Sequence, residues 1–223
     1  MDLKISSKKI YLMALSGIIL WFILILIAMF TYAGGTADDP NNVGYAFWGN
    51  TFSDLGRTVA WSSQSNLTSM ILFSLAYGIH AITMIPFYLQ VIKFFSDRNF
   101  EYKTSKIGSF FGILASVAII GIIFTPADIL NTPHWIFVYI GYPSLFLMGI
   151  TYSITLFLSE KFTRNFSYAF IMLFFIFFIA LMVGLIGIST SRIIMVIGQK
   201  IMRIALLIDL IILIYGIWKL EQN

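Results

Sequence analysis

The chain has 223 residues, of which 59% are hydrophobic and only 11% are charged, with a formal net charge of +4 and no cysteine. A soluble domain needs about a quarter charged residues to solvate its surface, so the composition excludes an ordinary soluble fold and indicates lipid as the solvent. Without cysteine the chain has no disulfides, thiolate nucleophiles or cysteine-ligated zinc, and with two histidines we expect no metal and no cofactor.

Charged residues divide the chain into apolar segments long enough to cross a bilayer. A hydrocarbon core of about 30 Å needs about 20 helical residues at a rise of 1.5 Å each. We therefore predict an all-α, polytopic membrane protein in which six transmembrane helices form a bundle and a single domain over residues 1–223. The predicted helices cover residues 10–32, 67–92, 107–125, 134–158, 168–188 and 200–219.

The basic residues predict the orientation of this bundle. With the N-terminus inside, most of the fourteen lysines and arginines lie inside, and only Arg57, Arg192, Lys200 and Arg203 remain outside. Because lysine and arginine in short loops set membrane topology, both termini are predicted to be cytoplasmic. The positive net charge is then a topology signal, and we expect no nucleic-acid partner.

Residues 33–66 form the one long connection between the predicted helices, and we expect this outer loop to fold back and cap the bundle. The loop starts with glycine, proline and asparagine and continues with Tyr45, Phe47 and Trp48, aromatic residues that suit a lipid headgroup interface. The other connections are short, so neighbouring helices are expected to form antiparallel hairpins.

The outer loop then reads Asn50-Thr51-Phe52-Ser53-Asp54-Leu55-Gly56-Arg57. In a structural interpretation, Ser53 or Asp54 caps a short helix and Gly56 ends it in a turn. In a functional interpretation, Asp54 points inward and pairs with a cation or a ligand headgroup, because ionisable groups near hydrocarbon are costly and mark sites. Ser53, Asp54 and Arg57 are therefore candidate ligand-binding residues.

The turn between the third and fourth predicted helices contributes two further candidates, Asp128 and His134. Thr132 followed by Pro133 predicts a helix N-cap and first residue, which places His134 in the first helical turn. The positive end of a helix disfavours imidazolium, so we expect a neutral His134 that acts as a base or simply donates a hydrogen bond. Asp128 is expected to hydrogen-bond to His134, as a static contact or as a group that orients a base.

Arg203 is predicted at the outer end of the sixth helix. It either extends to the headgroups, as long basic side chains do, or faces the bundle as an anion clamp. Asp54 and Asp128 are its available protein partners.

His80 and Asp209 form a predicted intramembrane polar pair. Each lies about halfway along a helix that runs from outside to inside, so we expect the two to face each other. Pairing would offset the cost of burying each group alone. The pair is either a static hydrogen bond or a proton relay.

The order of these motifs resembles the domain-of-unknown-function 998 family over about residues 45–220. The motifs are Asn50 to Gly56, Gly78 with His80, Gly112, Phe124 to Asp128 followed by His134, and Gly198 to Arg203 before Trp218. The chain departs from the family in Phe124-Thr125-Pro126, where a direct Phe-Pro is expected, and in Asp209. The resemblance implies a six-helix protein of a prokaryotic cytoplasmic membrane, with Asp54, Asp128, His134 and Arg203 at its outer face. It implies no activity.

Three functions remain open. The first is a binding or accessory protein with an outer-leaflet cavity for a lipid headgroup or small anion, formed by Ser53, Asp54, Arg57, Asp128, His134 and Arg203. The second is an intramembrane lipid-modifying enzyme with His134 as base and Asp54 or Asp128 as the group that orients it. In a variant of this alternative, Asp54, Asp128 and His134 together hold a metal ion that activates water. Against it, the chain has no nucleophile elbow, paired zinc histidines or phosphate loop. The third is a small proton-coupled transporter using His80 and Asp209. Membrane lipids are expected partners in each case, and a homo-oligomer or a subunit of a larger membrane complex is also possible.

Overall fold

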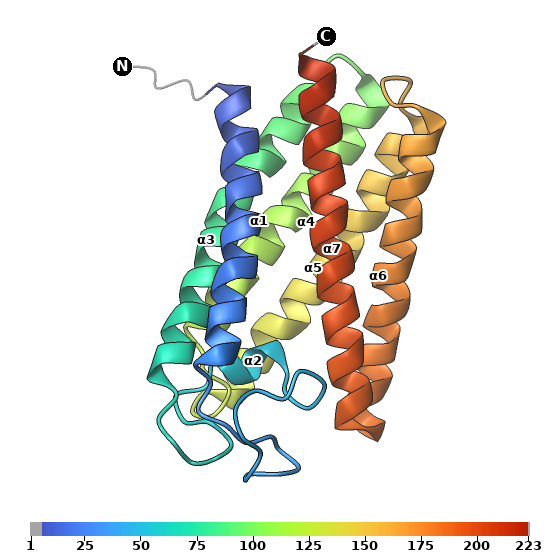
Figure 1. Cartoon of the computed structure of the whole chain (residues 1–223). Coiled ribbons are helices and arrows are strands. Elements are labelled where there is room, and N and C mark those ends of the chain that lie inside the picture. Colours follow the sequence, from blue (N-terminus) through green and yellow to red (C-terminus); the bar gives the residue numbers. More distant parts are fainter. Residues whose placement is uncertain (1–5, 223) are drawn as a thin grey trace.

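The computed structural model of the chain describes residues 6–222, and within that range it is an all-helical bundle (Figure 1). Six helices are long and apolar enough to cross a membrane, which confirms the predicted fold class. A one-turn helix, α2, lies in the long connection between the first two of them. The elements are α1 (Ser7–Phe30), α2 (Phe52–Leu55), α3 (Leu67–Phe94), α4 (Asn99–Ile123), α5 (Asn131–Leu158), α6 (Arg164–Thr190) and α7 (Arg192–Glu221).

Several helices begin earlier than predicted. Helix α4 begins at Asn99 instead of residue 107, and α7 begins at Arg192 instead of residue 200. Hydropathy detects only the part of a helix that matches the hydrocarbon, whereas the hydrogen-bonded backbone continues through polar turns on either side. As a result a single residue, Ser191, separates α6 from α7.

The helices form a ring in which most neighbours pack closely. Helix α1 packs closely on α3, α3 on α4, α4 on α5, and α6 on α7, whereas α1 and α7 contact each other only sparsely. The first residues of α1 and the last of α7 lie at one end of the bundle, the terminal end. The opposite end, with residues 31–66, the α4–α5 turn and Ser191, is the loop end. Helices α5 and α6 touch little, although a short turn joins them at the terminal end, and they diverge toward the loop end (Figure 1).

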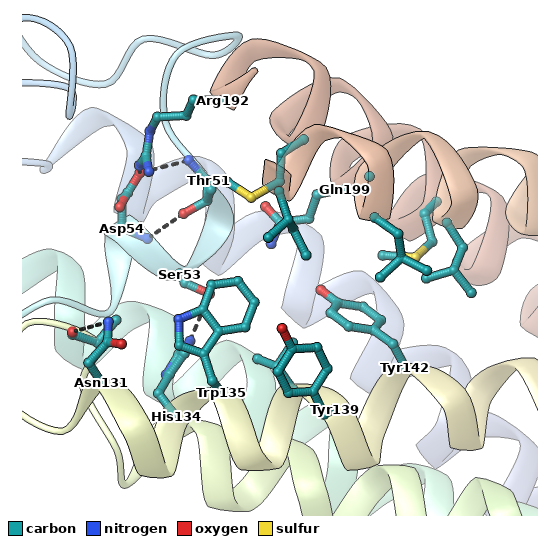
Figure 2. Close-up of a pocket in the computed structure, with 18 of the residues that line it drawn as sticks. Thr51, Ser53, Asp54, Asn131, His134, Trp135, Tyr139, Tyr142, Arg192 and Gln199 are labelled. Atoms are coloured by element: carbon teal, nitrogen blue, oxygen red, sulfur yellow. Dashed lines mark hydrogen bonds and ion pairs between the residues drawn. The ribbon is translucent and has the colours of Figure 1, made fainter. Parts of the chain in front are cut away.

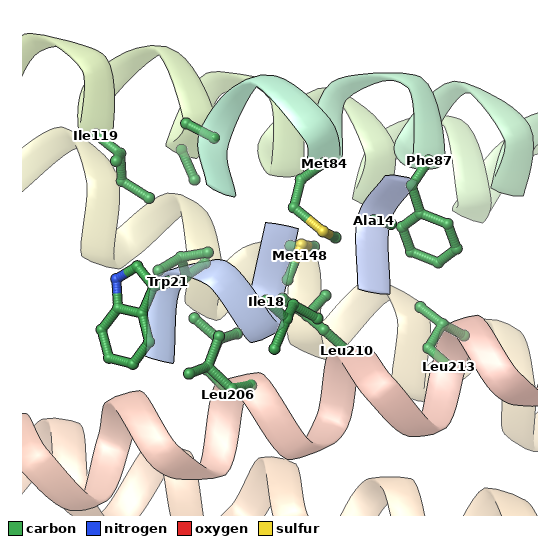
Figure 3. Close-up of a cluster of buried hydrophobic side chains, with 14 of the residues drawn as sticks. Ala14, Ile18, Trp21, Met84, Phe87, Ile119, Met148, Leu206, Leu210 and Leu213 are labelled. Atoms are coloured by element: carbon green, nitrogen blue, oxygen red, sulfur yellow. The ribbon is translucent and has the colours of Figure 1, made fainter. Parts of the chain in front are cut away.

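The core is a continuous apolar cluster to which all six long helices contribute (Figure 3). Large apolar side chains on the outer faces of these helices are exposed, including Ile19, Phe22 and Ile186. Lipid tails are as apolar as these side chains, so tight packing between helices must hold the bundle together. Side chains that meet in the cluster include Ala14, Ile18, Trp21, Met84, Phe87, Ile119, Met148, Leu206, Leu210 and Leu213.

Helices α6 and α7 approach so closely that only glycine fits between them at one position. A Cβ atom on Gly198 would lie 2.3 Å from the backbone nitrogen of Gly184 and 2.7 Å from the carbonyl oxygen of Ala180. Because both obstacles are backbone atoms, no side-chain movement relieves the clash. The close approach fixes where α7 places its first turns against the rest of the bundle.

We expect Gly198→Ala to lower the melting temperature of the detergent-solubilised protein, since the two helices must separate, at a cost of about 1–3 kcal/mol. Gly141→Ala is the matched control, because a Cβ there meets only the Ala118 side chain, at 3.5 Å. In that variant the higher helix propensity of alanine should leave stability unchanged or improved. Equal melting temperatures for the two variants would contradict the packing argument.

Candidate functional site

Two fully buried asparagines hold the long loop in shape at the loop end. Asn66 Nδ2 donates to the carbonyl oxygens of Leu55 (3.1 Å) and Arg57 (3.0 Å), and its Oδ1 accepts from Ala33 N (3.3 Å). Asn50 Nδ2 donates in the same way to the carbonyl oxygen of Gly35 (3.0 Å). These bonds satisfy backbone groups that have no regular secondary structure to pair them, so the loop is a defined scaffold for the side chains it carries.

Helix α2 is the short helix predicted in this loop, with Thr51 as its N-cap in place of Ser53 or Asp54. Thr51 Oγ1 accepts from Asp54 N (3.1 Å), and Asp54 Oδ2 accepts from Thr51 N (2.7 Å), which forms a capping box. Gly56 ends the helix as predicted. Gln199 of α7 fixes α2 from the other side, because its Oε1 accepts from Phe52 N (2.9 Å).

Asp54 is buried and forms an ion pair with Arg192, the first residue of α7, whose Nη2 lies 2.7 Å from Asp54 Oδ2. Asp54 also accepts from Trp61 Nε1 (2.9 Å) and Asn50 Nδ2 (3.3 Å), besides Thr51 N. Three of these donors share Oδ2, and the Trp61 indole donates to Oδ1. Asp54 therefore pairs with a cation, as one interpretation expected, and it does not hydrogen-bond to His134, whose ring nitrogens contact Thr125 and Ser53.

Arg57 and Arg192 approach the same indole ring. The guanidinium carbon of Arg57 lies 3.9 Å from the centre of the Trp61 ring, and that of Arg192 lies 5.3 Å from it. Arg57 Nε donates to the carbonyl oxygen of Val59 (3.0 Å), whereas Arg192 Nε is buried with no hydrogen-bond partner among residues 6–222. Arg192 pairs with Asp54, whereas Arg57 forms no ion pair within residues 6–222, so the two guanidinium groups and the one carboxylate leave a net positive charge and unused donors.

These side chains form the polar end of a cavity of about 290 Å³ bounded by α2, α5, α6 and α7 (Figure 2). The other end of the cavity lies between α5 and α6 and is largely apolar. Tyr139 on α5 and Leu185 on α6 line it and are also exposed on the outside of the bundle, so the cavity opens sideways where the two helices diverge. Lining residues include Ser53, Asp54, Arg57, Asn131, His134 and Arg192 at the polar end, and Val138, Pro143, Ala180, Leu181, Leu185, Ile188 and Met202 at the apolar end.

His134 lies in the first turn of α5, as predicted, although the N-cap is Leu130 rather than Thr132. Its Nδ1 lies 2.7 Å from the carbonyl oxygen of Thr125, and its Nε2 lies 3.2 Å from Ser53 Oγ. The expected hydrogen bond between Asp128 and His134 is wrong. The α4–α5 turn directs Asp128 toward the long loop, and the ring instead joins this turn to α2.

Asp128 fastens the segment after α2 to the α4–α5 turn. Its carboxylate accepts from the hydroxyl and the backbone N–H of Thr58 and from Val59 N (2.9 Å). Burial raises the pKa of Asp128, but these hydrogen bonds to the charged form outweigh it and hold the pKa below its ordinary value. Asp128 does not line the cavity. It acts on the site by positioning Arg57, one residue before Thr58.

We expected Arg203 at the outer end of its helix, but it lies inside the helix and does not line the cavity. Because α7 starts at Arg192, Arg203 lies about three turns into the bundle. Its guanidinium carbon lies 4.5 Å from the centre of the Tyr77 ring and 5.0 Å from that of Trp21. Arg192 makes the ion pair with Asp54 that was predicted as an option for Arg203.

The predicted pair of His80 and Asp209 is not formed. Both side chains are buried, but no hydrogen bond or ion pair joins them, and His80 Nδ1 and Asp209 Oδ1 have no partner within the described range. Helices α3 and α7 do contact each other, with Arg203 of α7 over the Tyr77 ring of α3, but His80 and Asp209 do not pair across this contact. The similar depth of His80 and Asp209 along their helices therefore did not mean that the two side chains are in contact.

Sequence reasoning missed Arg192, Trp61 and Gln199 as site residues. Arg192 carried one signal, since it is a cation between two long apolar segments, but it was used only to predict topology. Trp61 and Gln199 carried none. Asp54, Asp128 and His134 do not form the metal site that the enzyme alternative considered, because no three side chains of a kind that binds metals come together in residues 6–222.

No family model, curated protein or solved structure matches this chain. The resemblance to the domain-of-unknown-function 998 family accordingly stays a prediction from the sequence motifs. Of the outer-face residues that it implies, Asp54 and His134 line one cavity, whereas Asp128 and Arg203 do not.

We expect Asp54→Asn to destabilise the protein by about 3 kcal/mol, since it leaves the half-buried Arg192 without its counter-charge. The unfolding midpoint in detergent would measure this change, and limited proteolysis should find the loop at residues 31–66 more accessible. Asp38→Asn is the matched control, because Asp38 is exposed in the same loop. An Asp54→Asn protein as stable as this control would contradict the role given to the ion pair.

The segment that Asp128 fastens should loosen at acid pH. A carboxyl group whose pKa is lowered by folding contributes its full stabilisation above the unfolded value of about 3.9, and loses it as the pH falls through the lower folded value. Hydrogen exchange at the Thr58 and Val59 amides, corrected for intrinsic rates, should therefore accelerate below about pH 4. Asp128→Asn should abolish this pH dependence. The Ala60 amide, bonded to the Gln64 carbonyl, is the internal control.

Proposed function

We propose that this chain is a membrane-embedded binding protein for an anionic amphiphile. In this proposal Arg57 and Arg192 hold a phosphate- or carboxylate-bearing headgroup, and the apolar chain of the ligand lies between α5 and α6. One observation carries the proposal: a cavity with two guanidinium groups and a single carboxylate at its polar end opens, at its apolar end, between two membrane-spanning helices.

The electrostatics of the polar end favour an anion. Asp54 neutralises one of the two guanidinium groups and is already held by donors from Asn50, Thr51, Trp61 and Arg192. The unused donors of Arg57 and Arg192 are planar forks, which match the oxygens of phosphate and carboxylate bidentately. Trp61 lies against both side chains and shields them from water on one side, which strengthens charge–charge attraction.

The shape of the cavity favours a ligand with an apolar chain. Ligand cavities are mostly apolar with a few convergent polar groups, and this cavity has that character along one direction, from Arg192 to Met202. Its exposed walls, Tyr139 and Leu185, are on helices that would face lipid tails. A lipid can therefore enter sideways with its chain remaining in an apolar medium throughout.

The charge distribution supports a site in the outer leaflet. The terminal end carries most of the basic residues, so in this proposal it is cytoplasmic and the loop end is outside. The cell membrane of a prokaryote is the proposed location, in keeping with the family resemblance. The transporter alternative depended on a pair between His80 and Asp209, and that pair is not formed.

The test is binding by the full chain in nanodiscs. Phosphatidylglycerol should be retained in preference to phosphatidylcholine, as read by native mass spectrometry after mild detergent extraction. Arg57→Gln should weaken binding of the anionic lipid about tenfold, the effect of one charge-assisted hydrogen bond. Arg98→Gln is the matched control, because Arg98 is exposed in the α3–α4 connection at the terminal end. Equal retention of the two lipids would overturn the proposal.

A second variant separates a lipid headgroup from a free anion. Val138→Trp places a large side chain in the apolar part of the cavity and leaves the guanidinium groups in place. If the ligand is a lipid, this variant should lose phosphatidylglycerol and keep its affinity for inorganic phosphate. If the ligand is a free anion, phosphate should bind the wild type and Val138→Trp equally, and phosphatidylglycerol should not compete.

A further inference from the structure

We propose that Ser53 and His134 form a nucleophile–base pair that cleaves an acyl ester of the amphiphile bound in this cavity. This inference rests on the proposed binding function and adds a reaction to it. The pair joins α2 to the first turn of α5, residues 81 positions apart in the sequence. Both side chains line the cavity (Figure 2).

The hydrogen bonds of His134 determine which ring nitrogen faces Ser53 as a base. The carbonyl oxygen of Thr125, 2.7 Å from Nδ1, can only accept, so Nδ1 carries a proton. In the neutral ring Nε2 then has a free lone pair, and Ser53 Oγ, 3.2 Å away, donates its proton to it. This is the relation between a serine nucleophile and its general base.

The ring is held in that orientation by rigid surroundings. His134 is 5% exposed, and its orienting partner Thr125 directly follows the last turn of α4. Thr125 Oγ1 donates in turn to the carbonyl oxygen of Gly121 (2.8 Å), which fixes Thr125 against α4. A backbone carbonyl thus takes the orienting role that a carboxylate has in many serine hydrolases.

Ser53 is placed where an ester bond of the ligand would lie. The residue is in α2, which is fixed by the Thr51–Asp54 capping box and by Gln199. In Figure 2 the Ser53 side chain lies between the Asp54–Arg192 pair and the aromatic rings of Trp135 and Tyr139. An acyl ester of a lipid joins the headgroup region to the chain. With the headgroup at Arg192 and the chain beside Tyr139, this bond lies level with Ser53.

The reaction is ester hydrolysis in two steps. Ser53 Oγ attacks the carbonyl carbon of the ester while His134 Nε2 takes the hydroxyl proton. The ester bond to the alcohol oxygen then breaks, that oxygen takes the proton from His134, and acyl-Ser53 remains. Water attacks acyl-Ser53 with His134 again as base, which releases the fatty acid and restores the Ser53 hydroxyl. The net positive charge of the neighbouring guanidinium groups favours the negative charge that develops on the carbonyl oxygen.

Labelling with an alkyl fluorophosphonate tests the pair directly, because this probe phosphonylates activated serines. In detergent-solubilised full-length protein we expect covalent labelling at Ser53, located by peptide mass spectrometry. Ser53→Ala should abolish it, and His134→Gln should slow it at least about a hundredfold, the usual contribution of a general base. Ser65→Ala and His80→Gln are matched controls, since Ser65 is exposed in the same loop and His80 is buried in α3 away from the cavity. Both should label as the wild type does.

A pH profile of the wild type provides a readout that does not depend on whether His134→Gln folds. The labelling rate should rise with pH as one group, the imidazole, loses its proton, and then level off. A Ser53–His134 contact that is only structural would give no labelling at Ser53. Labelling that is independent of both pH and His134 would also overturn the proposal. Fatty acid released from phosphatidylglycerol vesicles by the wild type, and not by Ser53→Ala, should accompany the labelling.

The two proposals fail in different ways. Ser53→Ala should keep its preference for phosphatidylglycerol while losing labelling and fatty-acid release. If the folded wild type retains phosphatidylglycerol but Ser53 is never labelled, the reaction is wrong and the binding function stands. If Ser53 is labelled but the protein does not distinguish phosphatidylglycerol from phosphatidylcholine, the nucleophile–base pair stands and the anionic ligand is wrong.

Discussion

The ion pair between Asp54 and Arg192 is the constraint on which the loop end depends. It joins the long loop to the start of α7 across 138 positions of the sequence, in surroundings where an unpaired charge would be costly. The same carboxylate completes the capping box of α2 and accepts from Trp61. Asp54 neutralises the charge of Arg192, whereas no carboxylate within residues 6–222 forms an ion pair with Arg57. The polar end of the cavity is positively charged for this reason.

The divergence of α5 and α6 connects the positively charged end of the cavity to an opening on the side of the bundle. Helices that packed as closely as α6 and α7 do would leave no space beside Arg192, whereas α5 and α6 separate toward the loop end and form the sideways opening. A charged end and an apolar end then lie along one direction in the membrane. The contact of His134 with Ser53 lies at the polar end of the cavity, where the proposed amphiphile would carry its ester groups.

Pairing of the ionisable residues was poorly predictable from sequence, for a physical reason. Pairing of Asp54 with a cation was one of two interpretations, and the expected partner was Arg203; because α7 begins at Arg192, that residue pairs with Asp54 instead. Asp128 and His134 are near each other in the sequence, yet the turn between them directs Asp128 to Thr58 and His134 to Ser53. His80 and Asp209 do not pair, although α3 and α7 are in contact. In each case the partner of a side chain depends on the direction in which the side chain points and on how the helices pack, which composition and spacing do not encode.

The sequence by itself determined the six long apolar helices and the position of His134 in a first helical turn, and it offered a short helix near Asp54 as one interpretation of the long loop. These features follow from local properties: the length of apolar segments, capping residues and a proline at a helix start. Only the tertiary structure decided that Arg192 neutralises Asp54, that α5 and α6 separate, and that Ser53 meets His134. Those outcomes depend on how whole helices pack, through close contacts such as Gly198 against Gly184, and packing is a property of all the helices together.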